Sequence, residues 1–268
     1  MTPRLGLQLW SVRDALGADP DRTLEQIAAA GFEGVEPFGI GNPELTGDQR
    51  RERATVLGRE LKRLGLAVPS THVRMPRAPG LAALAEELAA LGAAVAIISC
   101  PQELEGFGQD ALATPDGVAE FAEELNALAA QASQLGLRIG YHNHWWDWSG
   151  AAEGAGYPRL VELVSPEIVF EIDAYWAWAA GQDPAALIRS LGRRAVFMHV
   201  KDGDGVPEQA QTALGEGSLE QAPVLEAGAD FEWWFVELDE AEPGADPVDV
   251  VTVSLRWLRE HTPGRTLP

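Results

Sequence analysis

The chain has 268 residues, and 20 Lys and Arg residues against 41 Asp and Glu residues give a formal net charge of −21. This balance disfavours nucleic acid and anionic membranes as partners, because both call for a basic face. Hydrophobic residues make up 46% of the chain and charged residues 23%, which is typical of a globular protein with a substantial core. The only cysteine is Cys100, which excludes an internal disulfide and favours a reducing, cytoplasmic location. Neither a signal-peptide pattern nor a run of about 20 apolar residues is present, so we expect neither secretion nor membrane insertion.

Short apolar segments rich in Val, Ile and aromatic residues alternate with longer Ala/Leu/Glu segments of helical period. The apolar segments predict eight strands, at residues 4–10, 34–38, 67–72, 94–99, 138–144, 168–173, 195–201 and 233–238. Helix starts are predicted where a capping side chain precedes a proline, at Asp19-Pro20, Thr114-Pro115, Asp183-Pro184 and Asp246-Pro247. Helix ends are predicted at Gly31, Gly65, Gly92, Gly136 and Gly192.

Eight strands that are each followed by a helix, in about 250 residues, indicate an α/β protein of the (β/α)8 TIM barrel class. An open doubly wound sheet would usually carry a Gly-rich phosphate loop after its first strand, and residues 9–13 contain none. No Pro-, Gly- or Ser-rich linker divides the chain, since the Gly-rich segments 150–158 and 202–217 each follow a predicted strand. A single domain over residues 1–268 is therefore predicted.

Active sites of such barrels lie at the carboxyl ends of the strands. The polar residues predicted there are Glu36, His72, His142, His144, Asp173, His199, Lys201, Glu237 and Asp239. Residues two apart on a strand share a side, so each of the last four strands directs ionisable groups to its inward face. Such groups are costly to bury unless they are paired or bind a metal, and carboxylates with imidazoles suit Mn²⁺, Co²⁺, Zn²⁺ or Mg²⁺. A buried network of hydrogen bonds or ion pairs is the alternative.

The segments that contain these residues resemble the sugar phosphate isomerase/epimerase family, which has a xylose isomerase-like TIM barrel. The matching segments are GLQLWSVRD, GYHNHWWDW, EIDAYWAWAAGQDP, FMHVKDGD, LGEGSL and FVELDE. The resemblance implies one divalent metal, held by Glu, Asp, His and Glu on strands five to eight. Asp173, His199 and Glu237 match the last three of these ligands. His142 stands where the first Glu would align, a variant that is also found in the inosose dehydratase-like branch.

This resemblance implies a sugar or sugar-phosphate isomerase or epimerase that removes a proton next to a carbonyl and stabilises an enediolate. Glu237 is one predicted base. His142 is either the fourth metal ligand or the second acid/base group, a role that Asp147 or some other group could also fill. Lys201 is predicted to hold a substrate oxygen or to form a salt bridge with Asp239 or Asp173. A His beside Glu237 could also expel a hydroxyl, so the alternative is a metal-dependent dehydratase or lyase that acts on a keto sugar or inosose.

Substrate contacts are predicted for Glu36, His72, His144, Asp147 and Trp176, because aromatic faces pack against the C–H face of a sugar. A purely structural hydrogen bond is the alternative for His72. The chain has no Lys/Arg cluster at strands seven and eight, which favours a small, non-phosphorylated carbohydrate; a homo-oligomer is left open. Two other classes are alternatives: a barrel that binds a carbohydrate without converting it, and a DNA repair enzyme related to endonuclease IV, which the charge of −21 disfavours.

Overall fold

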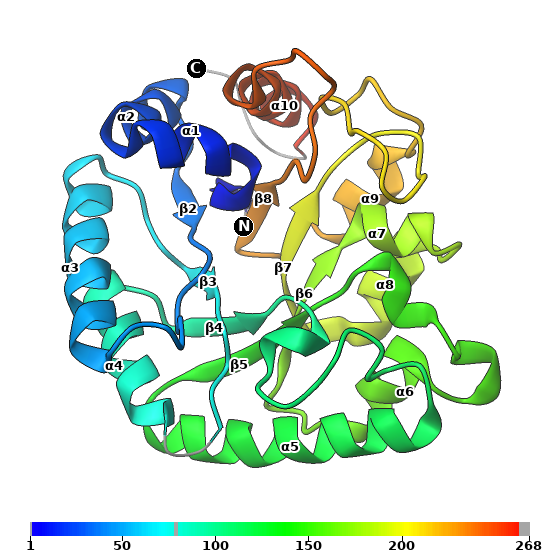
Figure 1. Cartoon of the computed structure of the whole chain (residues 1–268). Helices are drawn as coiled ribbons and strands as arrows, with labels where there is room; N and C mark the ends of the chain where they lie inside the picture. The colour runs from blue at the N-terminus through cyan, green and yellow to red at the C-terminus, as the bar shows by residue number, and fades with distance from the viewer. Residues whose placement is uncertain (1, 78–79, 263–268) are drawn as a thin grey trace. The chain divides into compact units, whose positions relative to one another are not determined.

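The structure is a computed structural model that describes residues 2–77 and 80–262, and in it eight strands alternate with helices (Figure 1). The strands are β1 (Arg4–Gln8), β2 (Gly34–Glu36), β3 (Ser70–His72), β4 (Val95–Ile98), β5 (Arg138–His142), β6 (Val169–Asp173), β7 (Ala195–Val200) and β8 (Trp233–Val236). Each strand lies inside the segment predicted for it, which confirms the (β/α)8 alternation. Most strands end one or two residues early. After β1 the backbone turns at once into the 3-10 helix η1 (Leu9–Val12), and two residues after β5 it enters η4 (Trp145–Trp148).

The helices begin and end at the predicted signals. Asp19, Thr114, Asp183 and Asp246 each accept a backbone N–H in the first turn of a helix that starts at the following proline. Gly31 and Gly92 close their helices in the left-handed conformation, which a residue without Cβ adopts at little cost. The helices are α1 (Arg13–Ala18), α2 (Pro20–Ala30), α3 (Gly47–Arg63), α4 (Leu81–Leu91), α5 (Pro115–Gln134), α6 (Gly156–Leu163), α7 (Ala174–Ala179), α8 (Pro184–Leu191), α9 (Gln221–Ala227) and α10 (Pro247–His261).

Chain contacts divide the protein into two compact units that alternate along the sequence. Unit 1 comprises Met1–Phe38, Glu60–Val68 and Ile172–Pro268, and unit 2 comprises Gly39–Arg59 and Pro69–Glu171. The boundary falls within β6, between Glu171 and Ile172.

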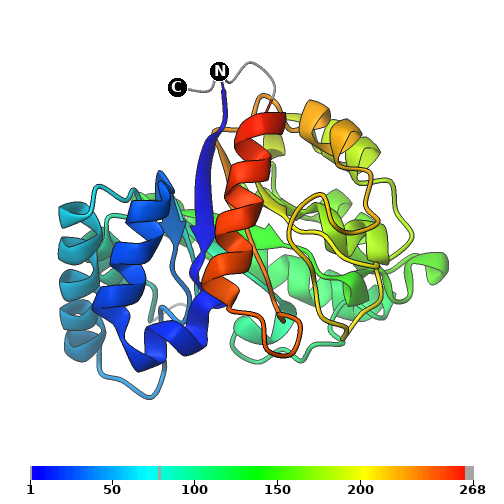
Figure 2. The same cartoon turned by 90° about the horizontal axis from the view of Figure 1, so that it is seen from above.

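Unit 1 is built on parallel strands in the order β2-β1-β8-β7. In their register Gly6 pairs with both Gly34 and Phe235, and His199 also pairs with Phe235. Gly34 has to be small, because a Cβ there would lie 2.7 Å from both the Trp233 ring and the Ala67 carbonyl oxygen. α10 packs against α2 and η1, and Figure 2 shows this helix in red beside the blue N-terminal segment.

Unit 2 is built on parallel strands in the order β6-β5-β4-β3. His72 pairs with Ile97 on β4, and His142 pairs with Glu171 on β6. The long helix α5 contacts β5 and buries Phe121 and other apolar residues of one face. His72 and His142, at the ends of β3 and β5, and Glu171 of β6 are among the polar side chains buried in this unit.

The predicted single domain over residues 1–268 stays a prediction. Within residues 2–77 and 80–262, every helix is too short or too polar to cross a lipid bilayer.

Candidate functional site

Unit 1 brings together three side chains of types that can bind a metal ion, at the ends of β6, β7 and β8. Asp173 and His199 are 0% exposed and Glu237 is 6% exposed. Each of the three offers one ligand atom, and these atoms lie within 4.8 Å of one another. Glu237 comes directly after β8, and its side chain contacts both His199 and Lys201. The structure therefore brings these three predicted residues together, and their roles as metal ligands stay predictions.

The His199 ring lies between two carboxylates of unit 1. Its Nδ1 is 2.5 Å from Glu237 Oε2, and its Nε2 is 2.8 Å from Glu36 Oε2. The Gln8 side-chain amide donates to the same Glu36 oxygen over 2.8 Å. Contacts on both ring nitrogens fix the orientation of the ring and direct Nδ1 towards Glu237.

The Lys201 side chain is almost wholly buried among three carboxylates. Its Nζ lies 2.8 Å from Asp173 Oδ2, 2.7 Å from Glu237 Oε2 and 2.5 Å from Asp239 Oδ2. Burial alone would lower the pKa of Lys201, but the negative charges of these three groups raise it well above its ordinary value. The salt bridges proposed for Lys201 with Asp173 and Asp239 are both present, and Glu237 adds a third.

Asp173 has a second role, as the N-cap of α7. Its Oδ1 accepts the backbone N–H of Trp176 over 2.8 Å. Burial raises the pKa of Asp173 to about 6, against the opposing charge of Lys201. Trp176 is 5% exposed, and Lys201 Nζ lies 5.1 Å from the centroid of its ring, within cation–π range. The cap fixes the direction in which α7 carries Trp176.

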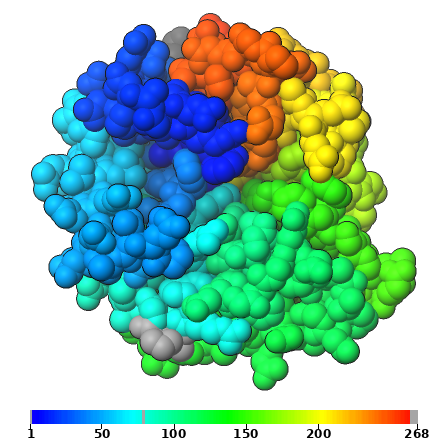
Figure 3. All heavy atoms as spheres, in the orientation of Figure 1, coloured from blue at the N-terminus to red at the C-terminus, as the bar shows by residue number. Residues whose placement is uncertain are grey.

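A hydrogen-bond network surrounds Asp239 at the edge of this cluster. Gln211 donates its side-chain amide to Asp239 Oδ2 over 3.0 Å, and its Oε1 accepts the Asp239 backbone N–H over 2.7 Å. Arg13 donates to the Asp239 carbonyl over 2.7 Å and pairs with Glu240. Figure 3 shows these two parts of unit 1, the dark blue N-terminal segment and the orange segment before α10, against each other at the surface.

The charge of the unit 1 cluster fits a cation. Four carboxyl groups, those of Glu36, Asp173, Glu237 and Asp239, face two basic side chains, Lys201 and His199. With all four carboxyl groups ionised and both basic groups protonated, the formal charge of the cluster is −2. A buried negative excess is costly unless a cation compensates for it. Carboxylate oxygens together with an imidazole nitrogen are donors that Mn²⁺, Co²⁺, Zn²⁺ and Mg²⁺ accept to different degrees.

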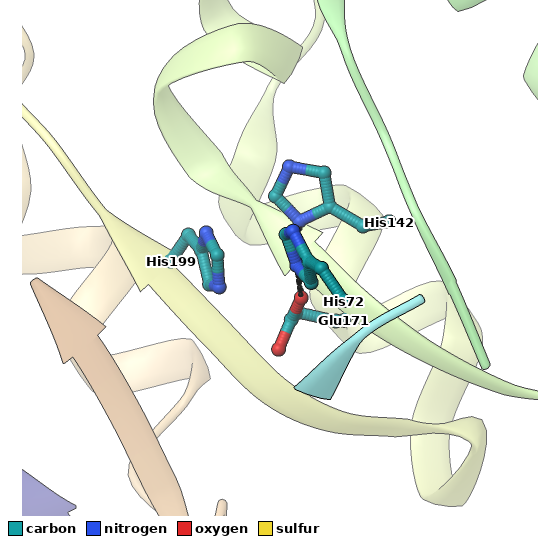
Figure 4. A group of neighbouring side chains, drawn as sticks. All are labelled: His72, His142, Glu171 and His199. Atoms are coloured by element: carbon teal, nitrogen blue, oxygen red, sulfur yellow. Dashed lines mark hydrogen bonds and ion pairs between the residues drawn. The ribbon is translucent and has the colours of Figure 1, made fainter. Parts of the chain in front are cut away.

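Unit 2 contains a cluster of His72, His142 and Glu171. Glu171 Oε2 lies 2.9 Å from His72 Nε2 and 3.2 Å from His142 Nδ1 (Figure 4). The Glu171 side chain is 0% exposed, that of His142 is 1% exposed and that of His72 is 11% exposed. One buried carboxylate oxygen therefore meets two imidazole nitrogens.

His144 and Asp147 follow β5 and contact the protein's own groups. The His144 ring stacks on Trp146, with centroids 4.3 Å apart and planes 10° apart. Asp147 is 0% exposed, and its Oδ2 accepts hydrogen bonds from the Tyr141 hydroxyl and the His144 backbone N–H. Burial raises the pKa of Asp147 to about 7. Asp147 and the backbone of His144 thus brace the turn after β5; substrate contacts by either side chain stay predictions.

The structure brings together two sets of predicted residues. Unit 1 joins Glu36, Asp173, Trp176, His199, Lys201 and Glu237, and unit 2 joins His72, His142 and His144. Substrate contacts by Glu36, His72 and Trp176 also stay predictions.

Sequence reasoning named none of Gln8, Gln211 or Glu171 as a site residue. Glu171 carries a signal that could have found it, because it lies two residues before Asp173 and shares its side of β6. Gln8 carries a weaker one, as a buried polar residue at the end of β1. Gln211 lies outside every strand and helix, and its pairing with Asp239 has no local signal.

Comparisons with known proteins agree on one fold. A family model described as xylose isomerase-like TIM barrel matches residues 24–261. The chain is 24% identical to an inosose dehydratase of Clostridium botulinum, over 94% of each protein. It is similar in structure to a sugar phosphate isomerase/epimerase from Parabacteroides distasonis, with a TM-score of 0.76 and 19% identity over 99% of this chain and 96% of that one. The IolI protein with a bound zinc atom gives a TM-score of 0.73 at 12% identity, over 99% and 100%. At these identities the solved structures support the fold alone.

Proposed function

Because the chain belongs to the xylose isomerase-like TIM barrel family, we propose that it is a divalent-metal-dependent isomerase or epimerase of a small carbohydrate. The proposed reaction removes a proton from the carbon next to a carbonyl and returns it elsewhere. One observation carries this proposal: Asp173, His199 and Glu237 are buried together, with ligand atoms within 4.8 Å of one another.

Asp173, His199 and Glu237 would hold the ion. When bound, a divalent ion would polarise the substrate carbonyl and lower the barrier to removal of the neighbouring proton. His199 would use Nδ1, the nitrogen that faces Glu237, while Nε2–H donates to Glu36. His142 as a fourth ligand or as an acid/base group remains a prediction from the pattern of strand ends. The identity of the metal is left to experiment.

Glu237 is the proposed base. Its Oε2 is held by His199 and Lys201, so the carboxylate has a fixed direction. It takes the proton from the carbon and returns it to the neighbouring carbon in an isomerase. In an epimerase a second acid/base group, on the opposite face of the substrate, would return a proton to the same carbon. The Lys201 ammonium remains protonated because its pKa is raised, and it stabilises the negative charge that develops on a substrate oxygen. Trp176 is the proposed packing surface for the C–H face of the sugar.

Exchange of substrate hydrogen with solvent tests this proposal. The protein loaded with Mn²⁺ is incubated in D₂O with a panel of ketoses and aldoses, and the sugars are recovered for mass spectrometry and NMR. Deuterium next to the carbonyl, with an otherwise unchanged molecular formula, supports the proposal. Glu237→Gln should reduce the exchange rate by at least about 100-fold, since general acid–base groups contribute about 10²–10⁴-fold.

Glu240→Gln is the matched control, because the Glu240 side chain is 67% exposed and pairs with Arg13 at the surface. Its exchange rate should equal that of the wild type. Exchange that persists in Glu237→Gln would refute the role of Glu237, and absence of exchange with every sugar would refute the isomerase.

The similarity to an inosose dehydratase over 94% of both chains favours a second candidate. In a dehydratase the same base would remove the proton next to the carbonyl, and the hydroxyl on the following carbon would leave as water after protonation. The D₂O experiment separates the two candidates, because elimination lowers the mass of the product by one water. Keto sugars and inososes therefore belong in the same panel.

A further inference from the structure

We infer that unit 2 contains a further divalent-cation site, formed by His72, His142 and Glu171. His142 is also the predicted fourth ligand of the Asp173, His199 and Glu237 set, and we assign it to the unit 2 site instead. The ligand atoms of His72, His142 and Glu171 lie within 4.8 Å of one another, and one Glu171 oxygen contacts both imidazoles (Figure 4). Two histidines with one carboxylate is a donor set that binds Zn²⁺ in hydrolytic enzymes and Fe²⁺ in oxygenases, with positions left open for other ligands.

The observed spacing is close to that around a bound ion. With metal–ligand bonds of about 2.1 Å, neighbouring ligand atoms lie about 3.0 Å apart in an octahedral site and about 3.4 Å apart in a tetrahedral one. Glu171 Oε2 is 2.9 Å from His72 Nε2 and 3.2 Å from His142 Nδ1. Both distances to the Glu171 oxygen therefore match the spacing of neighbouring ligands, and the third pair of ligand atoms lies within 4.8 Å.

Rigid elements hold the three residues in place. His142 and Glu171 are direct partners in the β5–β6 register, and His72 ends β3. The His142 ring makes T-shaped contacts with both neighbouring imidazoles, and its centroid lies 5.2 Å from that of His72 and 4.9 Å from that of His144. His144 in turn stacks on Trp146. A ligand set fixed by its surroundings loses little conformational freedom when an ion binds.

The charge of the group also suits a cation. Glu171 is a fully buried carboxyl group, and burial of a carboxylate is costly without a positive partner. A divalent ion supplies that charge while both imidazoles remain neutral. The alternative is that a proton on one imidazole supplies it, in which case the cluster is only an internal ion pair. Measurement of bound metal distinguishes the two.

The experiment measures Zn²⁺ and Co²⁺ bound per chain, by elemental analysis after removal of excess metal and by the visible absorption of Co²⁺. We expect two equivalents in the wild type and one in His72→Gln, in which the amide retains a hydrogen bond to Glu171 but is a poor ligand. Asp173→Asn should also lose one equivalent, that of unit 1. The double variant should bind none, and His261→Gln, which changes a histidine on the exposed end of α10, should bind two.

The metal affinity of each variant distinguishes the two sites further. His72→Gln should weaken the unit 2 site by more than about 100-fold, beyond the effect usual for groups outside the ligand shell. If the wild type binds one equivalent of metal and His72→Gln still binds it, this inference is overturned and the proposed function stays intact. A single equivalent that both variants lose would show one shared site and overturn it as well. Loss of metal only in His72→Gln would support this site and refute the metal site of the proposed function.

Discussion

Replacement of Glu36 by Gln tests whether His199 depends on this carboxylate to bind a metal. Glu36 is 0% exposed, and its Oε2 receives contacts of 2.8 Å from both His199 Nε2 and Gln8 Nε2. The amide of Gln has nearly the same size as a carboxylate but no charge, and its NH₂ group cannot accept a hydrogen bond. The substitution therefore replaces a charge-assisted hydrogen bond to the ring with a neutral one.

The expected magnitude follows from the two kinds of hydrogen bond. Charge-assisted bonds contribute about 1.5–3 kcal/mol and neutral ones about 0.5–1.5 kcal/mol, so the loss is about 1–2 kcal/mol. At 1.4 kcal/mol per factor of ten, this corresponds to a metal affinity about 5- to 30-fold weaker. The range overlaps the 10- to 100-fold effects of changing a group that orients a metal-ligating histidine.

Isothermal titration of the metal-free protein with Mn²⁺ measures this change. Glu25→Gln is the control, because its carboxylate is exposed in unit 1 and pairs with Arg63. An affinity in Glu36→Gln within twofold of the wild type, with folding shown by circular dichroism to be intact, would refute the role assigned to Glu36. Equal weakening in Glu25→Gln would show that the effect is not specific to the His199 contact.

Two further predictions concern buried charges. The pKa of Asp147, about 7, is raised above its ordinary value of 3.8, so the wild type should lose up to about 4 kcal/mol of stability as pH rises from about 4 to 7. Asp147→Asn should remove this slope in urea unfolding at pH 5, 6 and 8, and an unchanged slope would contradict the assignment. Lys201→Met leaves Asp173, Glu237 and Asp239 without their shared ammonium, and should cost about 3–5 kcal/mol. Added Mn²⁺ should raise the Tm of this variant more than that of the wild type or of Lys62→Met, an exposed control, and equal shifts would argue against a cation site.

The fold could be predicted from the sequence because its signals are local. A capping side chain before a proline, as at Asp19 and Asp246, sets the start of a helix through hydrogen bonds within one turn. Glycine at a helix end, as at Gly31, acts through its own backbone. Strand ends were less well predicted, because the pattern at residues 9–10 is the same whether the backbone stays extended or turns into a 3-10 helix.

Part of the candidate site was also within reach of the sequence. The alternation of side chains along a strand has a period of two, so His199 and Asp173 could be assigned to the inward side from their own segments. The rule that barrel sites lie at the carboxyl ends of strands then grouped them with Glu237. The same rule grouped His72 and His142, although it could not show that both meet Glu171.

The sequence by itself determined the succession of strands and helices and the chemical types of the site residues, because both depend on neighbours within a few positions. Only the tertiary structure decided which groups touch. His199 meets Glu36 across 163 positions, Lys201 meets Asp239 across 38, and Gln8 meets Glu36 across 28. These contacts depend on strand register and on side-chain rotamers, which are set by packing of segments far apart in the chain.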